Sequence, residues 1–164
     1  VEGLPCQILD TRKTAPGLRL LDKYAVRMGG GRNHRYHLGD GVLVKDNHWE
    51  ALKRAGITLA QGLEGLRGRV HHLIRIQVEV KDMAELSEAI GAGADVLLLD
   101  NMSPEEMAVA VKEVGGRLPL EASGGISLET VRRVAQSGVD FISIGALTHS
   151  PRALDISLEL EYQA

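Results

Sequence analysis

The architecture of this chain is clearest in the stretch IRIQVEV, residues 74–80. Its aliphatic side chains alternate with Arg75, Gln77 and Glu79, which is the two-residue period of a β-strand with two different faces. In a parallel sheet that is covered by helices, the aliphatic face packs outward against those helices. The polar face then points to the other side, where buried charges cost free energy unless they are paired or used. The stretch therefore indicates a functional site on the inner face of an α/β sheet.

Short apolar runs of the same kind alternate with longer amphipathic stretches on both sides of this segment. We predict strands at residues 7–12, 42–45, 73–80, 96–100, 118–122 and 140–145. We predict helices at residues 18–28, 48–55, 82–92, 104–114, 128–137 and 152–161. Asp82 and Ser103 are suitable N-caps, and Pro104 suits the first position of a helix.

The alternation of strand and helix predicts a parallel sheet with crossover helices. Glu79 and Asp100 are 21 residues apart, as are Asp100 and Glu121, so the β–α units have nearly constant length. We therefore expect a single domain over residues 1–164 with the α/β fold of an incomplete TIM-like barrel. It would have about six parallel strands with outer helices, whereas a complete barrel takes about 250 residues. A doubly wound open sheet is the alternative, but no glycine-rich dinucleotide-binding motif follows the first strand.

Composition limits the kinds of partner. The formal net charge of −3 provides no general attraction to nucleic acid or to anionic lipid. No apolar run approaches the roughly 18 residues of a membrane span. Cys6 is the only cysteine, so no internal disulfide forms, and we expect a cytoplasmic protein in which Cys6 has no special role. The chain begins with Val1 rather than Met, and we expect it to be part of a longer protein.

Cationic side chains gather after the first two strands and after the triple glycine at residues 29–31. The cluster consists of Arg12, Lys13, His34, Arg35 and Lys45. Arginine binds carboxylates and phosphates through a two-point fork and lysine acts as a mobile charge, so the cluster predicts a ligand with several negative charges. The alternative is solvated surface charge, which we favour for Arg27 and Arg32. Without a substrate, His34 and His37 would be ordinary hydrogen-bonded loop histidines.

Two carboxylates, Glu79 and Asp100, end neighbouring predicted strands, and Asp46 follows Lys45 directly. Carboxylates beside a phosphate site commonly hold Mg²⁺, directly or through water. They also stabilise positive charge that develops on a sugar carbon. Salt bridges to Lys45 or Arg12 are the alternative, and both interpretations are compatible in an empty site.

Small residues form the turns after the last two predicted strands. The turns contain Ser123, Gly124 and Gly125, and then Gly145. Backbone N–H groups approach a phosphate closely where side chains are small, and barrels commonly bind phosphate in the loops after the last strands. These turns are therefore the predicted phosphate site.

Seven motifs in this order resemble the quinolinate phosphoribosyltransferase family. They are TRKTAPG (11–17), GGGRNHR (29–35), KDNH (45–48), VEV (78–80), LDNM (99–102), EASGGI (121–126) and GALTHS (145–150). The resemblance implies transfer of a phosphoribosyl group from phosphoribosyl pyrophosphate to quinolinate, with decarboxylation to nicotinate mononucleotide, in NAD biosynthesis. It implies a magnesium-dependent pentosyltransferase. It also implies an N-terminal domain that this chain lacks, and a homo-oligomer, dimer or hexamer, whose site is completed by a neighbouring subunit.

By the same resemblance, the catalytic residues are Lys45, Glu79 and Asp100. Arg12, Lys13, His34, Arg35 and Lys45 would bind the quinolinate carboxylates, with some of them reaching the pyrophosphate. Glu79 and Asp100 would hold the ribose and Mg²⁺. Ser123, Gly124, Gly125 and Gly145 would bind the 5′-phosphate. Gln77 stands where many relatives are expected to have Glu.

Two other functions stay open. One is a related phosphoribosyltransferase of the same fold, acting on nicotinate or associated with molybdenum, although the two cationic motifs favour a dicarboxylate. The other is a non-catalytic binding or assembly module.

Overall fold

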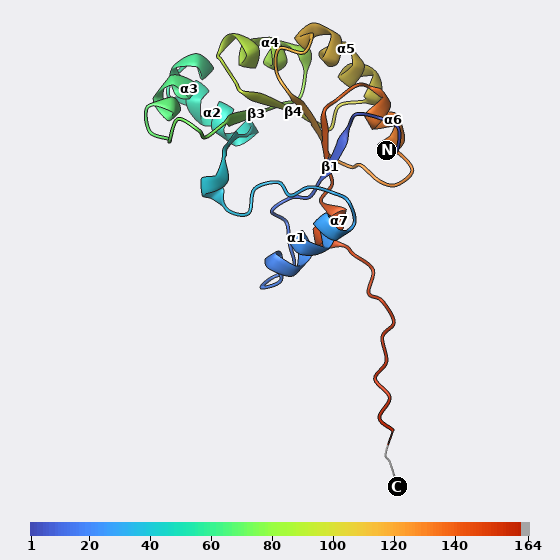
Figure 1. The fold of residues 1–164 in the computed structure, drawn as a ribbon. Helices are drawn as coiled ribbons and strands as arrows, with labels where there is room; N and C mark the ends of the chain where they lie inside the picture. Colours follow the sequence, from blue (N-terminus) through green and yellow to red (C-terminus); the bar gives the residue numbers. More distant parts are fainter. Residues whose placement is uncertain (162–164) are drawn as a thin grey trace.

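A computed structural model describes residues 1–161. Six parallel strands form one sheet in the order β1-β6-β5-β4-β3-β2. The strands are β1 (Gln7–Leu9), β2 (Val42–Val44), β3 (Ile76–Val80), β4 (Val96–Asp100), β5 (Leu120–Ser123) and β6 (Phe141–Ser143). β1 and β2 are the two edges and do not pair with each other, so the sheet curves without closing (Figure 1). The prediction of an incomplete α/β barrel is confirmed.

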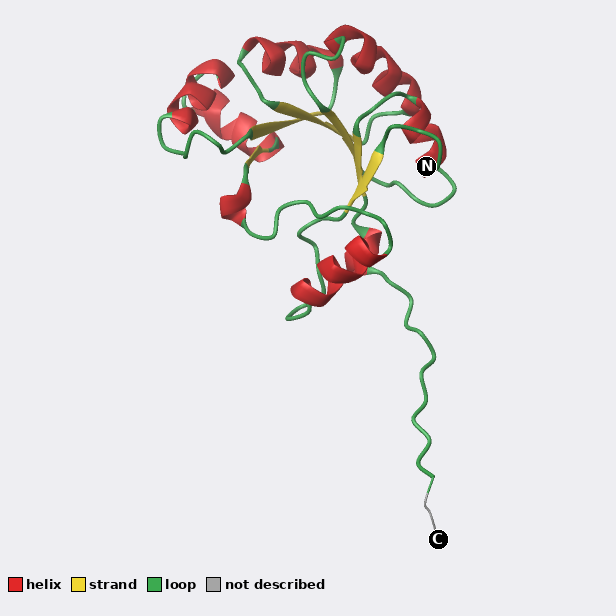
Figure 2. Cartoon of the chain, viewed as in Figure 1, coloured by secondary structure: helices red, strands yellow, loops and turns green. Residues whose placement is uncertain are grey.

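Helices cover the outer, convex face of the curved sheet (Figure 2). They are α2 (Asp46–Arg54), α3 (Leu59–Arg67), α4 (Met83–Gly91), α5 (Pro104–Val114) and α6 (Val131–Gln136), whereas α1 (Arg19–Met28) lies apart from this row (Figure 1). A short 3₁₀ turn, η1 (Leu38–Asp40), precedes β2, and α7 (Ala146–His149) follows β6. α1 and α7 contact each other beyond the edge strand β1 (Figure 1). Within residues 1–161, no helix is both long and apolar enough to cross a membrane.

The two faces of β3 behave as its alternation predicts. Ile76, Val78 and Val80 are almost completely buried in the core between the sheet and the outer helices. Gln77 and Glu79 alternate with these side chains and therefore lie on the opposite, inner face of β3. The core therefore lies outside the barrel wall, and the polar side chains of β3 lie on its inner side.

α3 was not predicted, because glycines at 56, 62, 65 and 68 obscure its pattern. A local signal was nevertheless present. The Thr58 hydroxyl accepts a hydrogen bond from the Gln61 N–H, and the Gln61 side chain accepts one from the Thr58 N–H, which is a capping box. Leu59 and Leu63 then bury one face of the helix.

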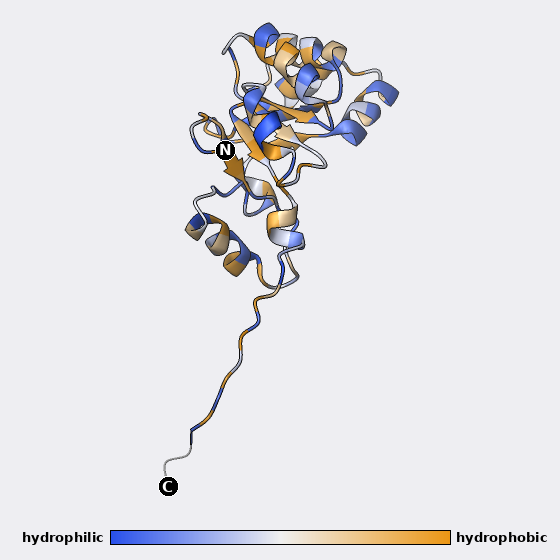
Figure 3. Ribbon diagram, turned by 90° about the vertical axis from the view of Figure 1, so that its right-hand side faces the viewer, coloured by the Kyte–Doolittle hydropathy of each residue, from blue (hydrophilic) through white to orange (hydrophobic). Residues whose placement is uncertain are grey.

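The predicted helix at residues 152–161 is wrong. Residues 151–161 contain neither helix nor strand, and they extend away from the barrel (Figure 1). Leu154, Ile156, Leu158 and Leu160 recur at every second position, and Figure 3 shows hydrophobic and hydrophilic residues alternating there. This is the period of a strand rather than of a helix. A helix of about ten residues has little stability without tertiary packing. These four side chains are exposed, so no such packing supports a helix here.

Candidate functional site

The carboxyl ends of all six strands meet at one edge of the sheet, because the strands are parallel. Every strand is followed or ended by a residue that the sequence singled out. They are Arg12 and Lys13 after β1, Lys45 after β2, Glu79 in β3, Asp100 in β4, Ser123 in β5 and Gly145 after β6. The structure thus gathers the predicted site residues at one rim instead of scattering them over separate surfaces. In parallel α/β proteins this rim is where ligands bind.

Lys45 and Glu79 form an ion pair across the β2–β3 boundary, with 3.2 Å between Nζ and the carboxylate. The Glu79 side chain is only 12% exposed, whereas that of Lys45 is 49% exposed. Trp49 on α2 supports the pair, because its indole N–H donates to the Glu79 carbonyl at 3.2 Å. The salt bridge proposed as an alternative for Glu79 therefore exists in the unliganded protein, and the Lys45 side chain is accessible from solvent.

Asp100 lies beside Ser123 in the β4–β5 register. The Asn101 side-chain amide donates to the Asp100 carboxylate at 2.8 Å. Gly124 packs directly on Asn101, since a Cβ built on Gly124 would stand 2.2 Å from the Asn101 side-chain oxygen. Glycine is required here by this close approach and by its φ of +95°. The predicted phosphate-binding turn at Gly124 therefore packs against Asn101, which holds Asp100.

Lys13, Gly145 and His149 form a second unit at the rim. A Cβ built on Gly145 would lie 2.8 Å from Nε2 of His149 and 3.9 Å from Cδ of Lys13. The Thr148 hydroxyl donates to the Lys13 carbonyl at 2.7 Å, which ties α7 to the segment after β1. His149 was not predicted as a site residue. Its only sequence signal was its place in the GALTHS motif.

A cavity of about 480 Å³ opens on the inner face of the sheet, where the first residues of β1, β2, β4 and β6 line it. Its lining includes Arg32, His34, Arg35, Arg75, Gln77 and Glu121. Burial, followed by the nearby charge of Arg12, lowers the pKa of Arg35 from its usual value. Within the described residues, the Nε atoms of both Arg12 and Arg35 are buried without a hydrogen-bond partner. Two guanidinium groups held near each other concentrate positive charge that favours an anion.

Glu121 lies at the centre of the inner face and is 3% exposed. Burial alone would raise the pKa of Glu121, but hydrogen bonding from His34 and from Gln77 holds it below its usual value. The Gln77 amide donates at 2.7 Å, and Nε2 of His34 lies 3.4 Å from the carboxylate. Nδ1 of His34 accepts the Arg35 N–H at 2.7 Å, so the ring proton belongs on Nε2, facing Glu121. Both ring nitrogens of His34 thus have protein partners, and its contact with a substrate stays a prediction. Glu121 ended a predicted strand, but it was not chosen as a site residue.

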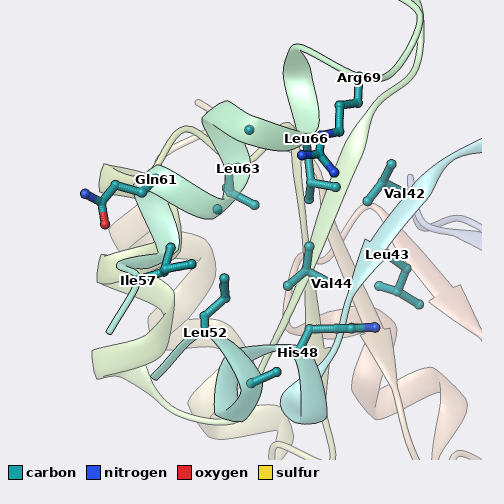
Figure 4. Close-up of a pocket in the computed structure, with 13 residues that line it drawn as sticks. Val42, Leu43, Val44, His48, Leu52, Ile57, Gln61, Leu63, Leu66 and Arg69 are labelled. Atoms are coloured by element: carbon teal, nitrogen blue, oxygen red, sulfur yellow. The ribbon is translucent and has the colours of Figure 1, made fainter. Parts of the chain in front are cut away.

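A separate apolar groove of about 490 Å³ lies between β2 and the helices α2 and α3 (Figure 4). Val44, Leu52, Leu63 and Leu66 point into it, and His48 lines one end. None of the predicted site residues lines this groove. Its chemistry does not suit a multiply charged ligand, so the rim, together with Arg35 near Arg12, forms the candidate site.

Several residues considered from the sequence lie apart from these contacts. His37 is exposed and pairs with Asp40 at 2.9 Å, as expected for an ordinary loop histidine. Asp46 is exposed and accepts the Asn47 N–H. Among residues 1–161, three or more His, Cys, Asp or Glu side chains do not come together in a metal-binding arrangement. Cys6 is buried, which raises the pKa of its thiol to about 11 and makes it a poor nucleophile.

Comparison with known proteins gives a consistent result. The family described as quinolinate phosphoribosyl transferase, C-terminal domain, matches residues 1–159. A probable nicotinate-nucleotide pyrophosphorylase [carboxylating] of Bacillus subtilis is 45% identical over 154 residues, covering 94% of this chain and 52% of the relative. The nicotinate-nucleotide pyrophosphorylase [carboxylating] of Mycobacterium leprae is 45% identical over 163 residues, covering 98% of this chain and 56% of the relative.

A solved structure, the nicotinate-nucleotide pyrophosphorylase from Francisella tularensis, superposes with a TM-score of 0.85 at 41% identity. The match covers 94% of this chain and 53% of that one. The chain therefore spans about half the length of the curated relatives that it matches.

Proposed function

The chain belongs to the quinolinate phosphoribosyl transferase family, whose C-terminal domain it matches almost from end to end, and on this basis we propose its activity. It forms the barrel part of an enzyme that transfers a phosphoribosyl group from phosphoribosyl pyrophosphate to quinolinate. The products are nicotinate mononucleotide, pyrophosphate and carbon dioxide. The reaction belongs to NAD biosynthesis, and the enzyme is a carboxylating nicotinate-nucleotide diphosphorylase when named for the reverse direction.

The observation that carries this proposal is the pair Arg12 and Arg35. Their charges are close enough for Arg12 to lower the pKa of Arg35, and their Nε donors have no partner in the described part of the chain. Holding two like charges in a partly buried place costs free energy, which a dianion recovers. The two adjacent carboxylates of quinolinate supply that charge in a rigid, planar arrangement that suits two guanidinium forks.

The rim residues have matching roles in the proposed reaction. Lys13, His34 and Lys45 complete the anion site around the two arginines. Glu79 and Asp100 face the ribose, where a fixed carboxylate stabilises positive charge on the sugar carbon. Ser123, Gly124, Gly125 and Gly145 hold the 5′-phosphate through backbone N–H groups.

The chemistry requires mainly positioning and charge stabilisation. The bond between the sugar carbon and the pyrophosphate oxygen breaks, and pyrophosphate leaves with the bonding electrons. The pyridine nitrogen attacks the sugar carbon and becomes quaternary. Loss of carbon dioxide from the adjacent ring carbon leaves an electron pair there, which the positive nitrogen stabilises and a proton from water then quenches. Positioning of this kind accounts for large rate effects, and a misplaced contact costs on the order of 100-fold.

Mg²⁺ belongs to the same proposal. Glu79 and Asp100 fit it, because Mg²⁺ is usually held by one or two carboxylates with waters and substrate phosphates, not by a complete protein cage. When bound, Mg²⁺ would neutralise charge on the departing pyrophosphate. Glu79 and Asp100 would hold it, directly or through water.

Association of several copies is also part of the proposal, with a neighbouring subunit completing the site. Its support is the apolar face of α1, where Leu20 is 72% exposed, Leu21 65% and Met28 62%. Exposed apolar patches of this kind mark interaction surfaces. We expect the assembly to act in the cytoplasm on these small substrates, without nucleic acid.

Turnover of the full-length protein separates this proposal from its alternatives. With quinolinate labelled in the carboxyl group next to the ring nitrogen, phosphoribosyl pyrophosphate and Mg²⁺, we expect labelled carbon dioxide and nicotinate mononucleotide in equal amounts. Nicotinate in place of quinolinate should give no product, whereas a nicotinate enzyme would show the reverse preference. Binding without product from either substrate would indicate a non-catalytic module and would overturn the proposal.

A further inference from the structure

A buried ion pair lies behind the anion site. Lys23 on α1 and Asp10, which follows β1, are both completely buried, and their charged atoms are 2.6 Å apart. Neither residue belongs to the rim described above. Lys23 also lies over the ring of Tyr36, with 5.1 Å between the ammonium nitrogen and the ring centroid. Such an arrangement is unusual for lysine, which is almost never fully buried unless it is paired.

The pair is not explained by stability alone. Removing two charges from water costs more than their attraction usually returns, so apolar residues of similar volume often serve the fold equally well. Buried ionic groups that persist commonly specify one local geometry instead. The partners of Asp10 and Lys23 show which geometry this is.

Both charged groups hold the backbone of His34. The Asp10 carboxylate accepts the His34 N–H at 2.7 Å, and the Lys23 ammonium donates to the His34 carbonyl at 3.0 Å. The Asn33 side chain joins the same network, since its amide donates to the Asp10 carboxylate at 2.6 Å and to the Lys23 carbonyl at 2.8 Å. The peptide groups on both sides of His34 are therefore fixed to β1 and α1 at once.

This fixation extends to the side chains of the site. Nδ1 of His34 accepts the Arg35 N–H, so the imidazole is oriented toward Glu121 and Arg35 begins from a fixed peptide. The Arg35 guanidinium also donates to the Gly41 carbonyl at 2.8 Å, and this contact fixes its orientation. A loop held by a buried charge pair can keep Arg35 near Arg12 despite their repulsion.

We infer that Asp10 and Lys23 are positioning residues that hold His34 and Arg35 in place for the dicarboxylate substrate. The inference rests on the proposed function for the identity of that substrate. It assigns a role to two residues that contact neither the substrate nor the rim. Their effect should fall on recognition of the dicarboxylate and not on the phosphoribosyl donor, which the carboxylates and the glycine turns bind elsewhere on the rim.

The test uses the full-length protein with the double substitution Asp10→Asn and Lys23→Met. Replacing both partners leaves no unpaired buried charge, so the variant should fold. The matched control is Arg67→Met with Asp95→Asn. This pair joins α3 to the start of β4 at 2.9 Å, at the opposite end of the strands from the rim.

We expect the KM for quinolinate to rise about tenfold in the double variant, the size of effect that follows from loss of a charge-assisted hydrogen bond. In the double variant, the KM for phosphoribosyl pyrophosphate should stay within about twofold of the unmodified protein's value, and kcat within about threefold. In the control variant, both KM values and kcat should stay within the same limits. In the substrate-free protein, hydrogen exchange at the amides of His34 and Arg35 should become faster in the double variant only.

An unchanged KM for quinolinate would overturn the inference, and so would an equal rise in both KM values, which would indicate a general structural role. If the unmodified protein showed no turnover, the proposed function would fail by itself. The exchange rates would then still decide whether the pair holds the loop, because they require no substrate.

Discussion

Replacement of Gly124 by alanine is a sharp probe of the contact that joins the phosphate turn to Asp100. The new Cβ would stand 2.2 Å from Oδ1, 2.5 Å from Cγ and 2.9 Å from the backbone nitrogen of Asn101. Asn101 has little room to retreat, since its N–H donates to the Ser123 carbonyl at 2.9 Å and its φ is +54°. The substitution must therefore displace part of the rim.

Two costs add at this position. A side chain at a φ of +95° costs about 1–2 kcal/mol in backbone strain, and the overlap with Asn101 costs about 1–3 kcal/mol more. Gly93→Ala is the matched control, because Gly93 has a φ of +83° and nothing within 4 Å of the added Cβ. It should show the backbone strain alone.

Urea unfolding of the 164-residue chain, followed by fluorescence of its one tryptophan, Trp49, measures both variants. We expect Gly124→Ala to lose about 1–3 kcal/mol more free energy of unfolding than Gly93→Ala. In the full-length protein, Gly124→Ala should also weaken binding of phosphoribosyl pyrophosphate, because the displaced Asn101 holds Asp100. Equal losses of stability in the two variants would refute the packing of Gly124 on Asn101.

Four further substitutions test other parts of the structure. Lys45→Ala and Glu79→Ala should each lower kcat roughly 100-fold with an unchanged circular dichroism spectrum, and near-normal turnover would count against their assignment. Folding lowers the pKa of Glu121. The ionised carboxylate therefore stabilises the folded protein at pH values above its unfolded pKa of about 4.3. This stabilisation is lost as the pH falls through the folded pKa. Urea titrations at several pH values should therefore show a smaller acid-induced loss in Glu121→Gln than in the parent, and equal losses would contradict the environment given to Glu121. Leu97→Ala should cost about 2–5 kcal/mol of unfolding free energy, because Leu97 is fully buried in the core; a cost below about 1 kcal/mol would show that the outer face of β4 is not packed as described.

The strands and the rim could be predicted because their signals are local. The alternation in residues 74–80 alone distinguishes the core face from the site face, and parallel strands then bring their carboxyl ends together. The outer helices other than α3 also follow from their caps and periodicity. The predicted helix at 152–161 failed because its leucines follow a strand period and nothing in the described chain packs against them.

The arrangement behind the rim could not be predicted in the same way. Lys23 occupies an ordinary position in an amphipathic helix, and its burial depends on Asp10, 13 residues earlier, and on His34, 11 residues later. The contact of Gln77 with Glu121 spans 44 residues. These partners meet only in the folded chain, and no motif in the sequence encodes their contacts.

The most direct measurement is a crystal structure of the full-length protein with quinolinate and a non-reacting analogue of phosphoribosyl pyrophosphate. We expect the two carboxylates to contact Arg12, Arg35 and Lys45, and the 5′-phosphate to lie against the turns at Gly124 and Gly145. Quinolinate bound away from the rim, for example in the apolar groove between β2 and α3, would contradict the account.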